Sequence, residues 1–225
     1  GELHGAFEPY VQRLADSQNI TLDKAYSELK RNYDGYHFSK NMVGMYNPFS
    51  LLNAFDSLEI GSYWFETGTP SYLVELLKRH DFKLDELKGN KVTANVLSAI
   101  DASSSNPISV IFQSGYLTIS GYNERYKLYS LDFPNEEVRE GFMLYLMPYY
   151  TSVSVNKTGF QISCFVEEVK SGDISGFMTR LESFFANVPY DLIKDTENHY
   201  QNVLFILCNL CGLYTKAEYH TSNGR

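Results

Sequence analysis

The sequence predicts a mainly α fold with a small β component, of the α+β class. Most of its 225 residues fall into segments where apolar side chains recur every three or four positions, which is typical of amphipathic helices. Two short alternating segments, residues 116–120 and 126–131, flank Gly121–Arg125 and predict a β-hairpin. A third alternating segment, residues 213–220, predicts one more strand near the C-terminus.

Helices dominate the expectation for the first eighty residues. They are expected over residues 1–18, after Thr21, over 48–57 and over 70–80. Asn47-Pro48 and Thr69-Pro70 each place a good N-cap residue before a proline at the first helical position, where the missing N–H of proline does no harm. These two pairs therefore predict where the third and fourth helices begin.

The middle of the chain has the element order of a winged-helix module. The expected elements are a short helix over 92–100, a polar loop over 102–106, a helix over 107–113 ended by Gly115, the hairpin, and a long helix over 136–150. A helix that reads DNA needs Arg, Lys, Asn or Gln directed at base edges. The helix at 107–113 has an apolar sequence without positive charge, so we expect it to pack against the protein rather than read DNA.

The last third of the chain is expected to begin with a polar linker and to end in a hairpin. The elements expected are a linker over 151–158, helices over 160–172 and 174–186, a loop over 187–191, and a strong helix from Asp195 to about Cys211 that Gly212 ends. Asn223-Gly224 is a strong hairpin signal directly after the strand at 213–220. Because the returning strand would begin at Arg225, the chain is interpreted as a fragment of a longer protein.

Composition limits the classes of function. The formal net charge of −8 argues against a broadly nucleic-acid-binding surface, although a local basic groove stays open. No apolar run is long enough for a membrane span, and no signal peptide is apparent. Three cysteines, an odd number, do not make a disulfide framework, so a reducing cytoplasm is expected. Cys208 and Cys211 lie in an apolar helical pattern and are interpreted as core thiols.

Aromatic residues and turn signals concentrate between residues 33 and 72. This region contains Tyr33-Asp-Gly-Tyr-His-Phe38, Tyr46-Asn-Pro-Phe-Ser50 and Tyr63-Trp-Phe-Glu-Thr-Gly68. Such a segment is either a structural junction between helices or the wall of a site. We expect Tyr36, His37, Phe38 and Trp64 to pack together, with Asn47 as the N-cap of the helix that Pro48 begins.

These three motifs resemble the C-terminal half of predicted bacterial AAA-ATPase-like proteins, in which an ATPase module is followed by a domain of the PD-(D/E)xK nuclease superfamily. Three later segments agree with the resemblance: Gln113-Ser-Gly-Tyr-Leu-Thr-Ile119, Phe133-Pro-Asn-Glu-Glu-Val-Arg-Glu140 and Asp195-Thr-Glu-Asn-His-Tyr-Gln201. The similarity covers nearly the whole chain.

The resemblance implies a division into four parts. These are a helical lid subdomain of the ATPase module (1–88), a winged-helix-like module (89–150), a helical linker region (151–194) and the truncated beginning of the nuclease-like domain (195–225). The phosphate-binding loop would precede Gly1, and the metal-binding strands would follow Arg225. ATP and Mg²⁺ are therefore implied for the parent protein, and no cofactor is expected for this chain alone. The implied partners are the two missing parts of the same polypeptide, with nucleic acid as a further partner of the parent and no membrane.

Several polar residues are candidates for a functional site. If the aromatic region faces the nucleotide, Tyr36, His37, Asn47 and Trp64 would lie near it. Glu197 is the candidate catalytic carboxylate of the nuclease-like domain, where such enzymes use divalent ions. The helix from Asp195 is expected to bury Tyr200, Leu204, Leu207 and Cys211, with Glu197 at the end of that stripe and partly exposed. No metal ligand is assigned. His37 and His199 are the histidines of interest, each with a structural role as the first alternative.

The acidic residues at 132–140 are interpreted as a solvated helix start. The group consists of Asp132, Glu136, Glu137 and Glu140, and the helix dipole favours carboxylates at this end.

Two hypotheses for the function of the parent protein follow. The first is a nucleotide-switched enzyme of nucleic-acid processing or defence, represented here without its active sites. The second is a non-enzymatic scaffold regulated by the ATPase, with a degenerate nuclease-like domain. Under either hypothesis the isolated chain should neither hydrolyse ATP nor cut DNA.

Overall fold

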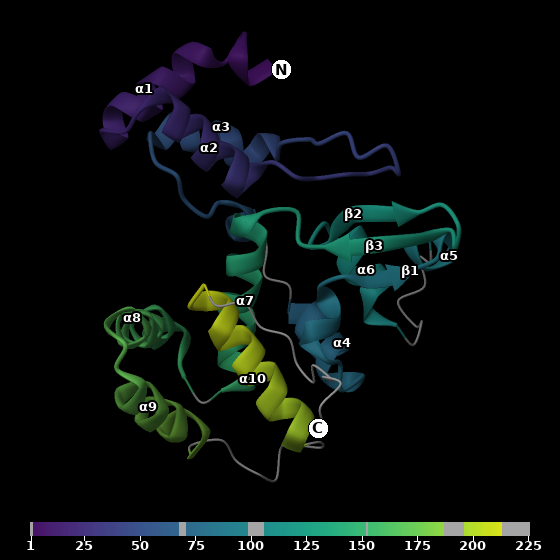
Figure 1. The fold of residues 1–225 in the computed structure, drawn as a ribbon, viewed down its shortest axis with the longest axis vertical. Helices are drawn as coiled ribbons and strands as arrows, with labels where there is room; N and C mark the ends of the chain where they lie inside the picture. Colours follow the sequence, from purple (N-terminus) through teal and green to yellow (C-terminus); the bar gives the residue numbers. More distant parts are fainter. Residues whose placement is uncertain (1, 68–70, 99–105, 152, 187–195, 213–225) are drawn as a thin grey trace. The chain divides into compact units, whose positions relative to one another are not determined.

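The computed structural model describes residues 2–67, 71–98, 106–151, 153–186 and 196–212 (Figure 1). The chain forms two compact units, of which unit 1 contains residues 1–70 and 87–141 and unit 2 contains residues 71–86 and 142–225. Helices dominate both units, and unit 1 adds a small antiparallel sheet. The mainly α class is therefore confirmed, and the four-part division stays a prediction.

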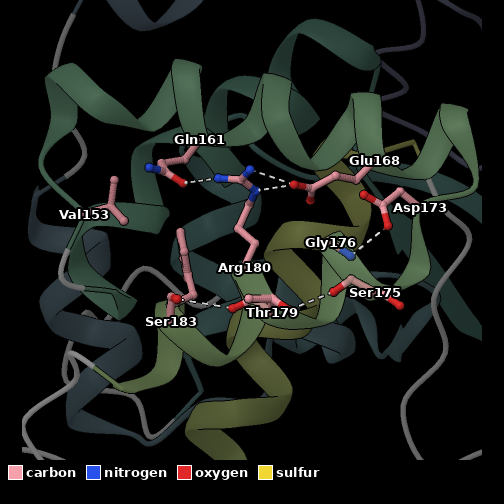
Figure 2. Close-up of a pocket in the computed structure, with 10 residues that line it drawn as sticks. Val153, Gln161, Glu168, Asp173, Ser175, Gly176, Thr179, Arg180 and Ser183 are labelled. Atoms are coloured by element: carbon pink, nitrogen blue, oxygen red, sulfur yellow. Dashed lines mark hydrogen bonds and ion pairs between the residues drawn. The ribbon is translucent and has the colours of Figure 1, made fainter.

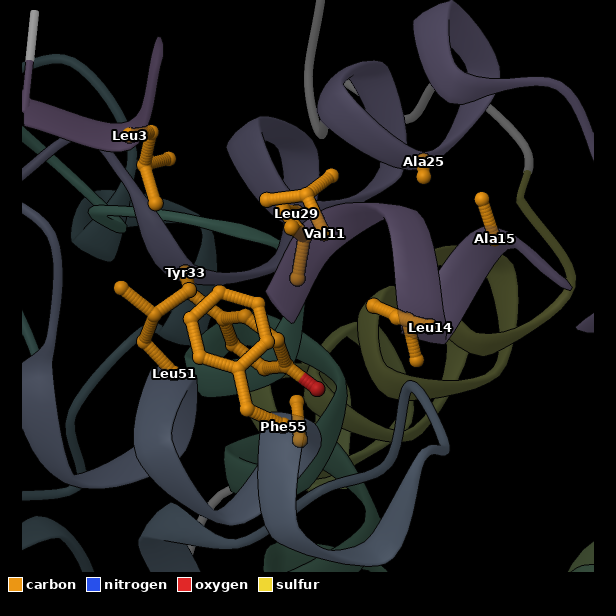
Figure 3. Packing of buried hydrophobic residues seen from close by; sticks show 10 residues of the cluster. Leu3, Val11, Leu14, Ala15, Ala25, Leu29, Tyr33, Leu51 and Phe55 are labelled. Atoms are coloured by element: carbon orange, nitrogen blue, oxygen red, sulfur yellow. The ribbon is translucent and has the colours of Figure 1, made fainter. Parts of the chain in front are cut away.

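Three N-terminal helices of unit 1 share an apolar core. They are α1 (Glu8–Gln18), α2 (Leu22–Tyr33) and α3 (Pro48–Ser57), preceded by a 3₁₀ turn, η1 (Glu2–His4). Their buried side chains recur every three or four residues, so each helix presents one apolar face to the others (Figure 3). The members shown are Leu3, Val11, Leu14, Ala15, Ala25, Leu29, Tyr33, Leu51 and Phe55. The expected helix over residues 1–18 thus begins at Glu8.

The capping signals place the next helices correctly. The Thr21 side chain accepts a hydrogen bond from Lys24 N at 3.2 Å at the start of α2. Asn47 caps α3 as predicted. In unit 1 the chain continues through a short 3₁₀ helix, η2 (Trp64–Thr67).

The sheet of unit 1 has three strands in the order β1-β3-β2. These are β1 (Asn90–Val92), β2 (Thr118–Asn123) and β3 (Leu128–Asp132), with the short helices α5 (Ala94–Ser98) and α6 (Pro107–Gln113) between β1 and β2 (Figure 1). The expected helix over 92–100 was wrong at its start, because residues 90–92 pair antiparallel with β3 instead. Three residues are too few to show an alternating pattern, and their partner lies forty residues away.

The predicted hairpin is confirmed, but its turn lies later than expected. β2 continues to Asn123, and the turn includes Lys127 with a left-handed φ of 52°. A register shift between Ile119 and Gly121 inserts a β-bulge into β2. The bulge adds a residue to β2 and moves the reversal of the chain beyond the Gly121 where the sequence suggested it.

Unit 2 contains α4 (Ser71–Arg79), most of the 3₁₀ helix η3 (Leu84–Leu87), and the C-terminal part of α7 (Glu136–Tyr150). It also contains α8 (Val155–Ser171), α9 (Ile174–Ala186) and α10 (Thr196–Leu210). The linker expected over 151–158 was wrong in its second half, because α8 begins at Val155. Thr158, which made this segment look polar, is buried and donates its hydroxyl hydrogen bond to Ser154 O at 3.2 Å.

Several expectations lie outside the described residues. They are the Thr69-Pro70 helix start, most of the loop at 102–106, the loop at 187–191, the strand at 213–220 and the turn at Asn223-Gly224. Among the helices that the structure describes, none combines the length and apolar character that a membrane crossing requires.

Candidate functional site

The aromatic motif residues of unit 1 pack together as predicted, with one exception. Tyr36 pairs with Met45 through two backbone hydrogen bonds of 3.2 and 3.0 Å, which closes the loop between them. The Tyr36 ring stacks on Phe38 and lies against Trp64, with ring centroids 6.2 and 6.1 Å apart. The Trp64 ring meets Tyr116 edge-on at 6.5 Å. We call the cluster of Tyr36, Phe38, Trp64 and Tyr116 the aromatic junction.

His37 does not join the aromatic junction, so that part of the prediction was wrong. Its backbone N–H donates to Thr118 Oγ1 at 2.6 Å, and its Nδ1 lies 3.0 Å from the carbonyl oxygen of Ile119. Neighbouring residues of an extended segment point in opposite directions, so the residue after Tyr36 faces the first residues of β2. His37 therefore fastens this segment to the sheet.

Asn47 is the N-cap of α3, and it makes more bonds than a cap requires. Its Oδ1 accepts from Phe49 N at 3.1 Å and Ser50 N at 3.4 Å, while its Nδ2 donates to Ser50 Oγ at 3.0 Å. Its own N–H donates to Tyr33 O at 2.7 Å, which ties the start of α3 to the end of α2. The capping prediction is confirmed, and the nearness of Tyr36, His37, Asn47 and Trp64 to a nucleotide stays a prediction.

Glu137 is the polar residue that the sequence interpretation placed wrongly. It was assigned to a solvated helix start, yet only 3% of its surface is exposed. Its Oε1 accepts hydrogen bonds from the backbone N–H of Tyr63 at 2.6 Å and of Trp64 at 2.9 Å. No local signal could have distinguished it from its neighbours, because the segment that covers it is more than seventy residues away in the sequence.

The electrostatics of Glu137 are those of a carboxylate removed from water. Burial raises its pKa above the ordinary value, although the two amides and the Ser50 hydroxyl act in the opposite direction. Its Oε2 and the Tyr36 hydroxyl are both buried without a hydrogen-bond partner among the described residues. The Glu137 charge also contributes to the raised pKa of the Tyr36 hydroxyl, after burial. A carboxylate with unfavourable solvation therefore lies directly beside the aromatic junction.

A pocket of about 420 Å³ in unit 1 lies where the motif that begins at Tyr33 approaches the motif that begins at Phe133. Gly35 has a left-handed φ of 106°, and a Cβ there would overlap the carbonyl oxygen of Pro134, so only glycine fits. The charged side chains that line the pocket are Lys30, Arg31, Asp34, Lys88, Asp132, Glu136 and Arg139. Arg31 pairs with Glu28 at 2.7 Å and Arg139 pairs with Glu136. Two of the four basic side chains that line the pocket, Arg31 and Arg139, are thus already paired with acidic side chains.

A second pocket, of about 710 Å³, lies in unit 2 beside α8 and α9 (Figure 2). Arg180 of α9 crosses it to Glu168 of α8, with Nη2 and Nε 2.6 and 2.7 Å from the same carboxylate oxygen. The Thr179 and Ser183 hydroxyls bond carbonyl oxygens one turn back in α9. Asp173 accepts from Gly176 N at 2.9 Å. Most of the interactions drawn in Figure 2 thus join residues of the pocket to one another, while Glu168 Oε2 is buried without a hydrogen-bond partner among the described residues.

The face that α10 buries differs from the expected stripe. Asn198, Asn202 and Ile206 are buried, whereas Leu204 is exposed and Tyr200 and Cys211 are half-buried. The stripe was predicted from apolar residues, but polar amides occupy part of the buried face because they bond backbone groups of residues 81–84. Glu197 is exposed, and its Oε1 lies 3.5 Å from Gln201 Nε2.

The remaining candidates of the sequence lie in unit 2. Cys208 and Cys211 are half-buried, and burial raises the pKa of Cys211 to about 11, which keeps its thiol protonated. The His199 ring stacks on Tyr150 at 6.2 Å, and burial followed by the charge of Lys78 lowers the pKa of His199. Across the described parts of the chain, His, Cys, Asp and Glu side chains form no group of three or more that could hold a metal ion.

Comparisons with known proteins add one relative. No protein-family model and no solved structure matches the chain. A protein of Azotobacter chroococcum mcd 1, described as an uncharacterized protein in the vnfD 5′ region, is 33% identical over 212 residues. The alignment covers 88% of this chain and 39% of that protein. The chain thus spans about two-fifths of the relative's length.

Proposed function

We propose that this chain is the lid and winged-helix part of a nucleotide-switched AAA-ATPase-like protein that also carries a nuclease-like domain. One observation carries the proposal: the motif segments on which the resemblance rests meet around Glu137. The backbone N–H groups of Tyr63 and Trp64 donate hydrogen bonds to its carboxylate, and a hydrogen bond with the Ser50 side chain acts to lower its pKa. The Tyr36 ring packs against Trp64. The segments at Ser50 and at Tyr63–Trp64 thus meet at one buried carboxylate of α7, and the segment at Tyr36 packs against Trp64.

The sheet supports the winged-helix part of the proposal. Two helices, α5 and α6, separate β1 from the β2–β3 hairpin, and β1 pairs with β3 at the edge of the sheet. Helices followed by a hairpin whose second strand pairs with an earlier short strand are typical of winged helices. Pro107, Ile108 and Ile111 of α6 are buried, which favours a packing role over DNA reading for this helix.

The proposed parent protein binds ATP with Mg²⁺ through a phosphate-binding loop outside this chain. In it, Tyr36, Asn47 and Trp64 lie on the side of the lid that faces the nucleotide, and Glu197 belongs to the metal site of the nuclease-like domain. The greater length of the Azotobacter relative supports the view that further segments accompany this sequence.

Nucleotide titration of the whole natural protein tests the proposal. Trp64 is the single tryptophan of the 225 residues. We expect Mg-ATP to change tryptophan fluorescence in the whole protein and to change it less in Trp64→Phe. The isolated chain should show neither ATP hydrolysis nor DNA cleavage. A whole protein that binds no ATP in the presence of Mg²⁺ would overturn the nucleotide switch.

A second assay separates the two functional hypotheses. Cleavage of labelled single- and double-stranded DNA and RNA is measured with the whole protein, Mg²⁺ or Mn²⁺, and ATP. Divalent-ion-dependent cleavage that disappears in Glu197→Gln supports the enzyme. Binding of ATP without any cleavage supports the ATPase-regulated scaffold and overturns the nuclease part of the proposal.

A further inference from the structure

We propose that residues 61–65 form a releasable strap over Tyr36 and Tyr116 of the aromatic junction, and that Glu137 and Gly141 of α7 are the latch that holds it closed. The strap is a conformational device within unit 1. It does not depend on the nucleotide function, because every contact that defines it lies in residues 33–141.

The strap is held by side chains rather than by a β ladder. At its start, the Tyr33 hydroxyl donates to Gly61 O at 2.9 Å and accepts from Gly61 N at 3.0 Å. In its middle, the Glu137 carboxylate accepts from the amides of Tyr63 and Trp64. The Tyr63 hydroxyl adds a local tie, since it donates to Glu59 O at 3.0 Å and lies 2.6 Å from Ser57 Oγ. A backbone segment fastened through side chains can leave as a unit, because releasing it breaks no continuous row of backbone hydrogen bonds.

A third contact lies on the same face of α7. Gly141 follows Glu137 by four residues, so the two positions lie one above the other on the helix. The Phe65 ring packs where a Gly141 side chain would be, and a Cβ there would overlap the ring. One face of α7 therefore contacts the strap in two ways. The Glu137 carboxylate accepts hydrogen bonds from Tyr63 and Trp64, and the missing side chain of Gly141 leaves room for the Phe65 ring.

The closed strap covers apolar surface of the aromatic junction. Trp64 lies against Tyr36 and Tyr116, and a Cβ at Gly115 would approach the Trp64 ring to 3.2 Å. The ring centroids of Phe65 and Tyr116 are 5.7 Å apart. Release of the strap would expose Tyr36 and Tyr116, which are 7% exposed when it is closed.

The chemistry of the latch favours two discrete states. Glu137 is an acceptor only, and both amides that it binds belong to the strap. When the strap leaves, the carboxylate regains water, which offsets part of the lost bonding, since burial of this charge is unfavourable. An apolar residue in place of Glu137 would gain no favourable hydration when the strap opens.

Amide hydrogen exchange and tryptophan quenching of the 225-residue chain test the proposal. Glu137→Ala removes the acceptor, so exchange at the Tyr63 and Trp64 amides should accelerate by about tenfold or more, and iodide should quench Trp64 more strongly. In Glu137→Gln the side-chain oxygen can still accept both bonds, so these two amides should exchange more slowly than in Glu137→Ala.

Gly141→Ala tests the latch without touching a hydrogen bond. Alanine favours the helix, so α7 itself should keep or gain protection. The Phe65 ring must move away from the added methyl group, so quenching of Trp64 should rise although the helix is no weaker. Glu140→Gln is the matched control, because Glu140 is a neighbouring acid of α7 without a bond to the strap, and it should leave both readouts unchanged.

Two outcomes would overturn the strap. One is unchanged exchange at Tyr63 and Trp64 in both Glu137→Ala and Gly141→Ala. The other is a uniform acceleration over α1, α2, α3 and α7 in both variants, which would mean that the whole of unit 1 opens together. Should Glu137→Ala fail to fold, Gly141→Ala and Glu137→Gln still decide the result.

Discussion

In each unit a buried polar side chain of a helix helps to fasten a segment that is neither strand nor α-helix, but the two side chains differ in kind. In unit 1, Glu137 of α7 accepts from two successive amides of the strap. In unit 2, Asn202 of α10 accepts from Leu84 N at 2.8 Å and donates to Phe82 O at 2.9 Å. A carboxylate offers only acceptors, whereas an amide offers a donor and an acceptor. The residue type therefore follows from which backbone groups the segment presents.

This difference has a consequence for how firmly each segment is held. Asn202 carries no charge, and its neighbour Asn198 adds a hydrogen bond from Nδ2 to Asp81 O at 2.6 Å. Burial of such a neutral and bonded amide has little solvation cost to recover on opening. Glu137 remains a buried ionisable group with one oxygen unbonded among the described residues. We therefore expect the segment 81–84 to open only with unit 2, and the strap to open by itself.

Asn202→Ala should have the largest effect on stability. It leaves Leu84 N and Phe82 O buried without partners, and each unsatisfied group costs about 1–3 kcal/mol, so the free energy of unfolding should fall by about 2–6 kcal/mol. Urea denaturation followed by circular dichroism measures the change.

The control for this variant is Asn209→Ala on the same helix. Among the described residues, the Asn209 side chain donates only to Phe205 O within α10, at 2.8 Å, so its loss should cost clearly less. Equal losses in the two variants would contradict the view that Asn202 holds the segment 81–84.

Glu137→Gln should change the pH dependence of stability. Burial raises the folded pKa of Glu137 above the ordinary value of 4.5, so its contribution is fully present below pH 4.5 and is lost as the pH rises through the folded pKa. The wild type should therefore lose stability relative to Glu137→Gln over that window, by at most about 1.4 kcal/mol per pH unit. Burial raises the pKa of the Tyr33 and Tyr36 hydroxyls, which lie near Glu137, well above the ordinary value near 10, so both stay neutral over this range.

The stability difference between wild type and Glu137→Gln is measured from the midpoints of urea denaturation at a series of pH values from about 4 to 8. Asp132 and Glu140, whose pKa values burial also raises, are present in both proteins and largely cancel in the difference. A stability difference that is flat with pH, or that grows in the opposite direction, would show that the two amides outweigh burial at Glu137.

Asn47→Ala should cost about 1 kcal/mol through the lost cap. Asn47 is the neutral counterpart of Glu137, because its Oδ1 also accepts from two successive amides. Thermal and urea denaturation at pH 7 measure the loss, and the value should not vary with pH. Asn53→Ala is the matched control, since within the described parts of the chain the Asn53 side chain donates only to Phe49 O of α3.

Local signals predicted much of the fold but little of the latch. Thr21, Asn47-Pro48 and the left-handed Gly115, Gly172 and Gly212 fix helix ends through the backbone geometry of a few neighbours. β1 escaped prediction because its pairing with β3 is distant in the sequence. The burial of Glu137 was not predicted, because it depends on the distant strap. The buried face of α10 was predicted wrongly, because an amide side chain that bonds buried backbone groups can occupy a core position.

Glu197→Gln should have the smallest effect on stability, and it completes the comparison. Glu197 and Glu137 are each the second residue of their helix, α10 and α7, where the helix dipole favours a carboxylate. One is exposed and the other buried, so only Glu137 should affect folding strongly. The free energy of unfolding should change by less than about 0.5 kcal/mol in Glu197→Gln. In the whole natural protein, calorimetric titration with Mg²⁺ or Mn²⁺ should show weaker binding by this variant. Equal affinity in variant and wild type would leave Glu197 as a helix-start charge without a role in a metal site.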